Sequence, residues 1–196
     1  MSTLLKLRCG PLFLALVIIA SSCGFAQEKA DSTPPGEEQA GFKEFASLAQ
    51  KYAGLHRKIE GSLPKLKTNS SPALIDARQQ TLAEHIQQAR ENAHPGDIFS
   101  PAASEAFHRV IARTFRGSQG DNARATIRQG APVANAHLQV NHAYPSKLPH
   151  TTVPPTLLQK FPKLPPELAY RIVGKDLVLL DVKANLIADV MRQALP

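Results

Sequence analysis

Apolar residues recur at helical spacing in the first two thirds of the chain. Between residues 39 and 59 they fall at three- and four-residue steps, so one face of a helix carries them all. The stripe consists of Phe42, Phe45, Leu48, Tyr52, Leu55 and Ile59. Gly61 and Pro64 follow it and predict the end of this first helix.

Two Ser-Pro pairs predict where the second and third helices begin. Serine is a common N-cap and proline suits the first helical position, so Ser71-Pro72 and Ser100-Pro101 are start signals. The stripes that follow are Leu74, Ile75, Leu82 and Ile86, then Ala103, Phe107, Val110, Ile111 and Phe115. A short fourth turn is expected over residues 121–128. We therefore expect residues 39–130 to form a helical group, with Phe45, Tyr52, Ile86, Phe107 and Ile111 in its core.

The pattern changes over residues 131–168, which hold eight of the 16 prolines. Such a density of proline excludes long helices and central strands, so an extended arm is expected. Apolar residues alternate with the prolines, which favours an arm that packs on the helices. One helical turn is expected over residues 156–160.

Strand patterns occupy the end of the chain, residues 169–196. Gly174-Lys175 separates two apolar runs and predicts a two-residue hairpin turn, because glycine accepts a positive φ. A further turn and a third strand complete a small antiparallel meander. We expect Asp176, Asp181 and Asp189 to form turns or to charge a strand edge. The fold class is therefore α+β, and residues 39–196 are expected to form one domain.

The first 26 residues have the pattern of an export signal. Lys6 and Arg8 precede an apolar run at residues 11–20, which is shorter than the roughly 20 residues that a spanning helix needs. Small residues favour cleavage after Ala26, which would make Gln27 the new N-terminus. Alternatively, Cys23 could be lipidated and anchor the protein. Residues 27–38 would then be a flexible leader, and no membrane-spanning segment is expected after cleavage.

Composition narrows the function classes. Both cysteines, Cys9 and Cys23, lie in the signal segment, so the form cleaved after Ala26 has no thiol and no disulfide. Cleavage removes two basic and no acidic residues, which leaves 21 basic against 16 acidic residues and a net charge of +5. This mild excess favours an anionic partner, but it falls short of a nucleic-acid-binding signature.

The tail carries three strings, VPPTLL, FPKLPPEL and YRIVGKDLVLLDVKANLIADV. They resemble the C-terminal segment of a group of exported bacterial proteins with the pattern VPPxLL, LPxLP and YRxVGxDLxLxDxxANLIxD. Phe161-Pro162 stands here where that group has Leu-Pro. No activity is attached to the group, so the resemblance assigns no functional residue. The strands are also similar to the C-terminal meander of exported nickel/cobalt-homeostasis proteins.

No catalytic or cofactor motif is present. The chain has no HExxH, P-loop or GxGxxG sequence, and the stretch at residues 117–120 is no GxSxG nucleophile elbow. We therefore assign no catalytic residue and no cofactor.

Two residue types suggest binding chemistry. His137, His142 and His150 lie in the proline-rich arm and are weak candidates for a metal site, although their spacing follows no ligand rule. Five arginines are candidates for an anion-binding surface, because guanidinium groups bind phosphate and carboxylate groups bidentately. They are Arg109, Arg113, Arg116, Arg124 and Arg128. The alternative is an ordinary solvated helix face, with some pairing to Glu105 and Asp121.

These observations favour an exported, non-catalytic domain that binds or scaffolds a component of the cell envelope. Its location would be periplasmic or secreted, or that of a lipoprotein. Two alternatives stay open, a periplasmic metal-binding or metal-homeostasis protein and an envelope hydrolase with a dispersed site.

Overall fold

Both Ser-Pro pairs begin helices, as predicted. In the computed structural model, the Ser71 hydroxyl accepts the Leu74 N–H and the Ser100 hydroxyl accepts the Ala103 N–H. The structure describes residues 35–117, 120–128, 137–148 and 152–196, all within one compact unit, Thr33–Pro196. The helices are α1 Pro35–Ser62, α2 Pro72–Ala89, α3 Pro101–Arg116, α4 Gly120–Arg128 and α5 Pro155–Leu158.

Three strands form the C-terminal antiparallel sheet, so the α+β prediction is confirmed. They are β1 Leu168–Val173, β2 Asp176–Asp181 and β3 Leu186–Met191, in the order β1-β2-β3. Gly174 has a φ of 60° in the two-residue turn between β1 and β2. The predicted hairpin is therefore present, with glycine at the position that needs the left-handed conformation.

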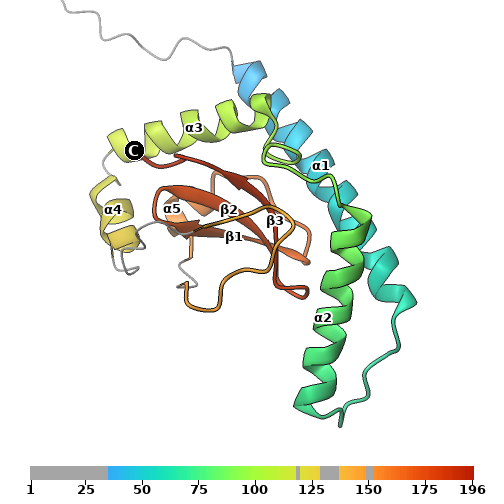
Figure 1. Cartoon of the computed structure of the whole chain (residues 1–196). Coiled ribbons are helices and arrows are strands. Elements are labelled where there is room, and N and C mark those ends of the chain that lie inside the picture. Colours follow the sequence, from blue (N-terminus) through green and yellow to red (C-terminus); the bar gives the residue numbers. More distant parts are fainter. Residues whose placement is uncertain (1–34, 118–119, 129–136, 149–151) are drawn as a thin grey trace, which may run out of the picture. The chain divides into compact units, whose positions relative to one another are not determined.

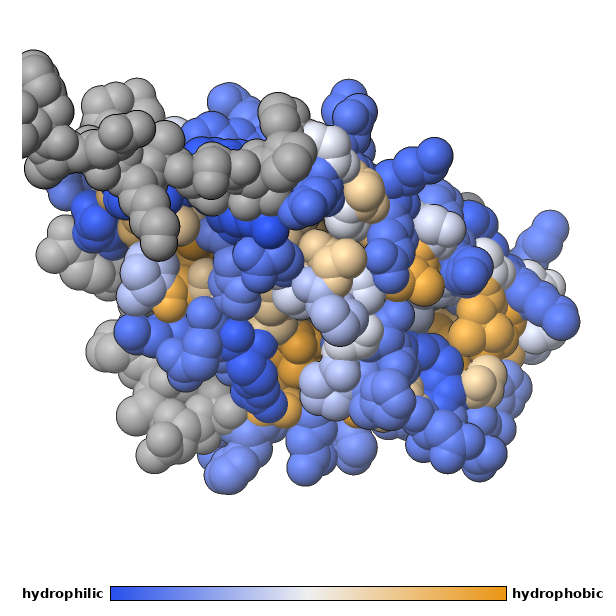
Figure 2. Space-filling view, turned by 90° about the horizontal axis from the view of Figure 1, so that it is seen from above, coloured by the Kyte–Doolittle hydropathy of each residue, from blue (hydrophilic) through white to orange (hydrophobic). Residues whose placement is uncertain are grey.

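The sheet has an apolar core on each face. Leu177 and Leu179 of β2 face the core that α1 and α3 cover, whereas Val178 and Leu180 belong to a second core on the opposite face (Figure 1). Residues 138–148 cover that second face, with Leu138, Val140 and Tyr144 buried. Seen from above, the surface is mostly hydrophilic and apolar residues show in separate patches (Figure 2).

The two-sided burial corrects the expectation that the whole arm packs on the helices. Its later part does, because Val153, Leu157 and Phe161 join the helical core. Its earlier part packs on the sheet instead. The physical reason lies in β2 and β3, which are apolar at successive positions and therefore bury both faces.

Two further expectations are corrected. Helix α1 begins at Pro35, so Glu37 and Glu38 belong to its first turn and not to a leader. Acidic residues are favourable there, because the helix N-terminus carries partial positive charge. Leu74 and Ile75 are about half exposed, since only the later part of α2 reaches the core through Leu82 and Ile86.

The segments expected to carry the export signal lie outside the described residues, including Cys23, Ala26, Gln27 and the leader up to residue 34. Within the part of the chain that the structure describes, no helix has both the length and the apolar character to cross a membrane.

Candidate functional site

A buried histidine and a buried aspartate meet where α1 crosses the end of β2. The His56 Nδ1 atom lies 2.6 Å from Asp181 Oδ2, and both side chains have no exposed surface. Tyr52, one helical turn before His56, donates its hydroxyl hydrogen to the same carboxylate oxygen at 2.9 Å. The residues come together because Tyr52 and His56 lie at i and i+4 on α1. Asp181 continues the alternation of Leu177 and Leu179 toward the helices.

Asp181 also caps the turn between β2 and β3. Its second oxygen, Oδ1, accepts the N–H groups of Lys183 and Ala184 at 3.1 and 2.9 Å. The prediction that Asp181 forms a turn is therefore confirmed. The sequence did not indicate that its Oδ2 atom is buried against α1.

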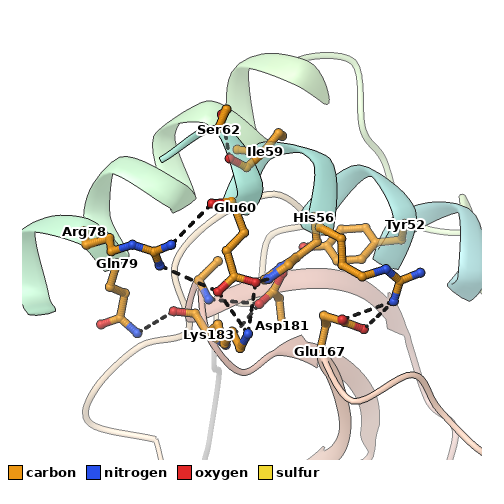
Figure 3. A network of polar contacts seen from close by, with 12 residues as sticks. Tyr52, His56, Ile59, Glu60, Ser62, Arg78, Gln79, Glu167, Asp181 and Lys183 are labelled. Atoms are coloured by element: carbon orange, nitrogen blue, oxygen red, sulfur yellow. Dashed lines mark hydrogen bonds and ion pairs between the residues drawn. The ribbon is translucent and has the colours of Figure 1, made fainter. Parts of the chain in front are cut away.

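Glu60 lies on the other side of the imidazole (Figure 3). Its Oε2 atom is 3.4 Å from His56 Nε2, and Lys183 Nζ donates to both Glu60 oxygens at 2.9 and 3.0 Å. The Arg78 guanidinium of α2 lies 3.6 Å from Glu60 Oε1. The network therefore joins α1, α2 and the turn after β2.

The charges of this network favour a protonated His56. Burial lowers the pKa of His56, but its hydrogen bond to Asp181 and the negative charges of Asp181, Glu60 and Glu167 outweigh burial and raise the pKa above its ordinary value. Burial raises the pKa of Glu60, but Lys183, His56 and Arg78 lower it by a larger amount. The pKa of Glu60 is therefore below its ordinary value. The buried Nε2 atom of His56 has no hydrogen-bond partner among the described residues. When protonated, it directs an N–H toward the Glu60 carboxylate.

These shifts predict how stability depends on pH. The folded state binds the His56 proton more tightly than the unfolded state does, so this contribution is complete below pH 6.5 and is lost as pH rises through the raised pKa. In urea titrations across this range, wild type should lose more unfolding free energy than His56→Gln. Parallel curves for the two proteins would show that His56 is not charged in the fold.

The arrangement is suited to holding elements together. Its titratable groups are hydrogen-bonded within the chain, and neither Tyr52, His56 nor Asp181 lines the pocket at the start of α1 or the pocket along β1. Asp189 of β3 is another buried aspartate, and it joins the sheet to the loop before α3. Its buried carboxylate accepts the N–H groups of Gly96, Ile98, Phe99 and Val190. Asp189 is therefore not a strand-edge charge, because backbone donors surround it.

The predicted arginine surface is largely paired within the chain. Arg109 pairs with Glu105 and Glu37 at 3.1 and 3.5 Å, and Arg113 pairs with Glu38 at 2.6 Å. The expected pairings to Glu105 and Asp121 are confirmed, the second by Arg124 at 3.2 Å.

The other two arginines differ. Arg116 is exposed at the end of α3, and the side chain of Arg128 lies outside the described part. Acidic side chains hold Arg109, Arg113 and Arg124, so among the arginines whose side chains are described only Arg116 has no ion pair.

The histidine candidates are not assembled by the described residues. His137 and His142 are exposed, and His150 lies outside the described part. Nowhere in the described ranges do three or more histidine, cysteine, aspartate or glutamate side chains form a group that could hold a metal ion.

A basic groove that sequence reasoning missed lies between the start of α1, α5 and β1. Its first section, of about 690 Å³, is lined by Phe42 and Lys43 of α1 together with Lys160. Its second section, of about 430 Å³, runs along β1 and is lined by Lys163 and Arg171. Phe161 and Pro162 line both sections, so the two are adjacent. We call this surface the lysine groove.

The charged side chains described in the lysine groove are all positive. Among the described residues that line it, four are basic and none is acidic. Its floor is apolar, and Leu158 is 51% exposed beside it. The one signal in the sequence was Lys160-Phe161-Pro162-Lys163, in which two cations bracket an apolar pair. Apolar lining with a few fixed charges is typical of binding sites.

Comparison with protein-family models, curated proteins and solved structures finds no match to this chain. The functional argument therefore rests on the geometry of the site.

Proposed function

We propose that the protein is an exported, non-catalytic binding module of the cell envelope that holds an anionic partner in the lysine groove. The observation that carries this proposal is the groove itself, which combines an apolar floor with four cationic side chains and no acidic one. An anionic partner would gain from the cations, and the apolar floor would bury part of its surface.

The groove is favoured over the arginine face because its lysines have no acidic partner among the described residues. Lys43 and Lys163 have no ion pair with any described residue, and Lys160 donates to a neutral group, the Thr114 hydroxyl, at 3.0 Å. The arginines of α3 are instead held by glutamates of the same chain. Among the described residues, the groove therefore holds more cations without an acidic partner in the chain than the arginine face does.

The absence of a catalytic role is supported by where the reactive groups lie. The His56 imidazole and the Asp181 carboxylate are fully buried and bonded to one another. A general acid or base must come within hydrogen-bond reach of the proton that it transfers. Export is supported by the apolar run at residues 11–20 and the small residues before Gln27.

Photo-crosslinking in intact cells tests the proposal. Benzoylphenylalanine in place of the exposed Leu158 should form a partner adduct that is recovered from the envelope fraction. The same probe in place of the exposed His108 on α3 should form none. Adduct formation at position 158 should fall at least about tenfold in a Lys160→Glu, Lys163→Glu background, because two attractive charges become repulsive. Equal labelling from both positions, or adducts that persist after charge reversal, would rule out the groove as the binding surface.

A further inference from the structure

Exposed apolar side chains gather where α1 ends and α2 begins. Five large apolar residues of the described part of the chain are exposed, and three of them lie in this one segment. Leu66, Leu74 and Ile75 are 38%, 53% and 47% exposed, and the first two line the same hollow. We call this surface the apolar tip; it consists of Leu63, Pro64, Leu66, Leu74, Ile75 and Ala77.

The apolar tip projects beyond the sheet. Helix α2 first bonds to the C-terminal part of the chain at Gln79, whose side-chain amide donates to Lys183 O at 2.9 Å. Earlier residues of α2 have no hydrogen bond to the sheet among those described, and Figure 1 shows this end of α2 and the preceding loop extending past the strands. No other element therefore covers Leu74 and Ile75 within the described ranges.

Polar contacts fix the loop that presents the apolar tip. The Ser70 N–H donates to Lys67 O at 3.0 Å, and the Lys67 N–H donates to Ser70 Oγ at 2.9 Å. The Arg78 guanidinium of α2 donates to Pro64 O at 2.9 Å. The loop is therefore fastened to α2, and the apolar side chains are held at the surface.

Positive charge accompanies the apolar tip. Lys58, Lys65 and Lys67 are exposed and have no ion pair with any described residue. Leu66 stands between two of these lysines in the sequence. Asp76 is the one acidic residue between positions 61 and 77, so the lysines outnumber it.

The shape and charge of the tip suit a lipid surface better than a small ligand. The hollow beside Leu66 has a volume of about 190 Å³, below the roughly 300–1,000 Å³ of ligand pockets. A bilayer needs no deep pocket, because projecting apolar side chains enter the boundary between headgroups and acyl chains. Lysines beside them are attracted to anionic headgroups.

We propose that the apolar tip inserts into the surface of an anionic lipid bilayer, with Lys58, Lys65 and Lys67 at the headgroups. This inference is independent of the lysine groove, which lies toward the other end of α1. Since α1 extends from Pro35 to Ser62, roughly 30 Å of helix separates Lys43 in the groove from the tip. A protein bound to lipid through the tip keeps the groove free for its partner.

Vesicle sedimentation tests the proposal. The chain that begins at Gln27 is used, because it keeps the compact unit Thr33–Pro196 and lacks the apolar run at residues 11–20. Vesicles in which about a third of the lipid is phosphatidylglycerol should bind it at least about tenfold more strongly than phosphatidylcholine vesicles. Lys65→Glu, Lys67→Glu should remove this preference, because two attractive charges become repulsive.

Paired variants separate the apolar tip from other apolar surface. Leu74→Ser, Ile75→Ser should lower binding to the anionic vesicles at least about tenfold, because apolar burial drives insertion. Leu158→Ser removes a leucine that is equally exposed, at 51%, beside the lysine groove, and it should change vesicle binding less than about twofold. All three side chains are about half exposed, so the variants should keep the unfolding midpoint of wild type.

A fluorescent side chain reports insertion directly. The chain contains no tryptophan, so Leu66→Trp supplies a single indole at the tip. Its emission should shift to shorter wavelength on addition of anionic vesicles and should be quenched by brominated lipid. His108→Trp, on an exposed position of α3, is the control and should show neither change.

The outcomes keep this inference apart from the proposed function. Vesicle binding that survives Leu74→Ser, Ile75→Ser, or a Leu66→Trp emission that does not shift, overturns insertion of the tip. If Lys160→Glu, Lys163→Glu or Leu158→Ser lowers vesicle binding instead, the lysine groove holds the lipid and the tip does not. If neither vesicle binds, and benzoylphenylalanine at position 66 forms protein adducts in intact cells, the tip docks a protein and the lipid proposal is wrong. In every case the crosslinking experiment at position 158 decides the proposed function by itself.

Discussion

Phe107→Ala should lower the free energy of unfolding by about 3–5 kcal/mol, the usual loss when a buried phenylalanine is truncated. Phe107 of α3 has no exposed surface and lies at the centre of an aromatic cluster. Its ring centroid is 4.8 to 5.9 Å from those of five neighbours, which are Phe42, Phe45, Phe99, Phe161 and Tyr170. These neighbours come from α1, the loop before α3, the arm and β1. Truncation therefore leaves a cavity between α3 and four other parts of the chain.

Urea unfolding followed by circular dichroism measures this loss. Phe107→Leu keeps most of the apolar volume and should cost less than Phe107→Ala. Leu158→Ala is the matched control, because Leu158 is 51% exposed and its truncation should change stability by no more than about 0.5 kcal/mol. Equal midpoints for Phe107→Ala and Leu158→Ala would show that the aromatic cluster does not hold these elements together.

Sequence reasoning succeeded where the cause is local. The caps at Ser71 and Ser100 depend on residues within one helical turn, and the Gly174 turn depends on a single φ angle. The buried positions Phe45, Tyr52, Ile86, Phe107 and Ile111 followed from helical periodicity. The exposure of Leu74 and Ile75 could not be derived in this way. Periodicity shows which face of a helix is apolar, but it does not show how far the neighbouring elements extend along that face.

The polar network was beyond such reasoning, because its partners are far apart in the chain. His56 and Asp181 are separated by 125 positions, and neither position carries a motif. A clue was present in α1, since His56 follows Tyr52 by four residues and so continues the apolar stripe. The sequence pattern assigns Leu55 to that stripe, whereas the structure leaves Leu55 partly exposed and buries His56 completely.

The lysine groove was missed for a related reason. Lys43 is far from Lys160 and Lys163 in the sequence, so the three cations gather only after the arm folds against α1. On sequence alone, the five arginines are stronger candidates because they lie close together in the chain. Glu37 and Glu38, which the sequence pattern places in a leader, pair with two of them. Because the sequence pattern starts α1 at residue 39 and not at Pro35, it does not identify Glu37 and Glu38 as partners of the arginine face.

Asp181→Ala should be among the most destabilising single substitutions in the protein, with a loss of about 3–5 kcal/mol, as expected when one partner of a buried ion pair is removed. The change leaves the His56 imidazole and the Tyr52 hydroxyl buried without their acceptor. It also removes the acceptor of the Lys183 and Ala184 N–H groups, which fixes the turn after β2. Asp181→Asn should cost less, because an amide oxygen can keep those two turn bonds.

A double-mutant cycle isolates the part of this loss that belongs to the ion pair. Asp181→Asn and His56→Gln each remove one partner, and the combined variant should lose less stability than the two single losses together, by about 0.5–3 kcal/mol. Asp121→Asn is the control for a carboxylate in an exposed pair, since its side chain is 98% exposed and faces Arg124. That variant should lose no more than about 1 kcal/mol. If the two single losses simply add, His56 and Asp181 are not coupled, and burial of the surrounding apolar side chains would suffice to hold α1 against the end of β2.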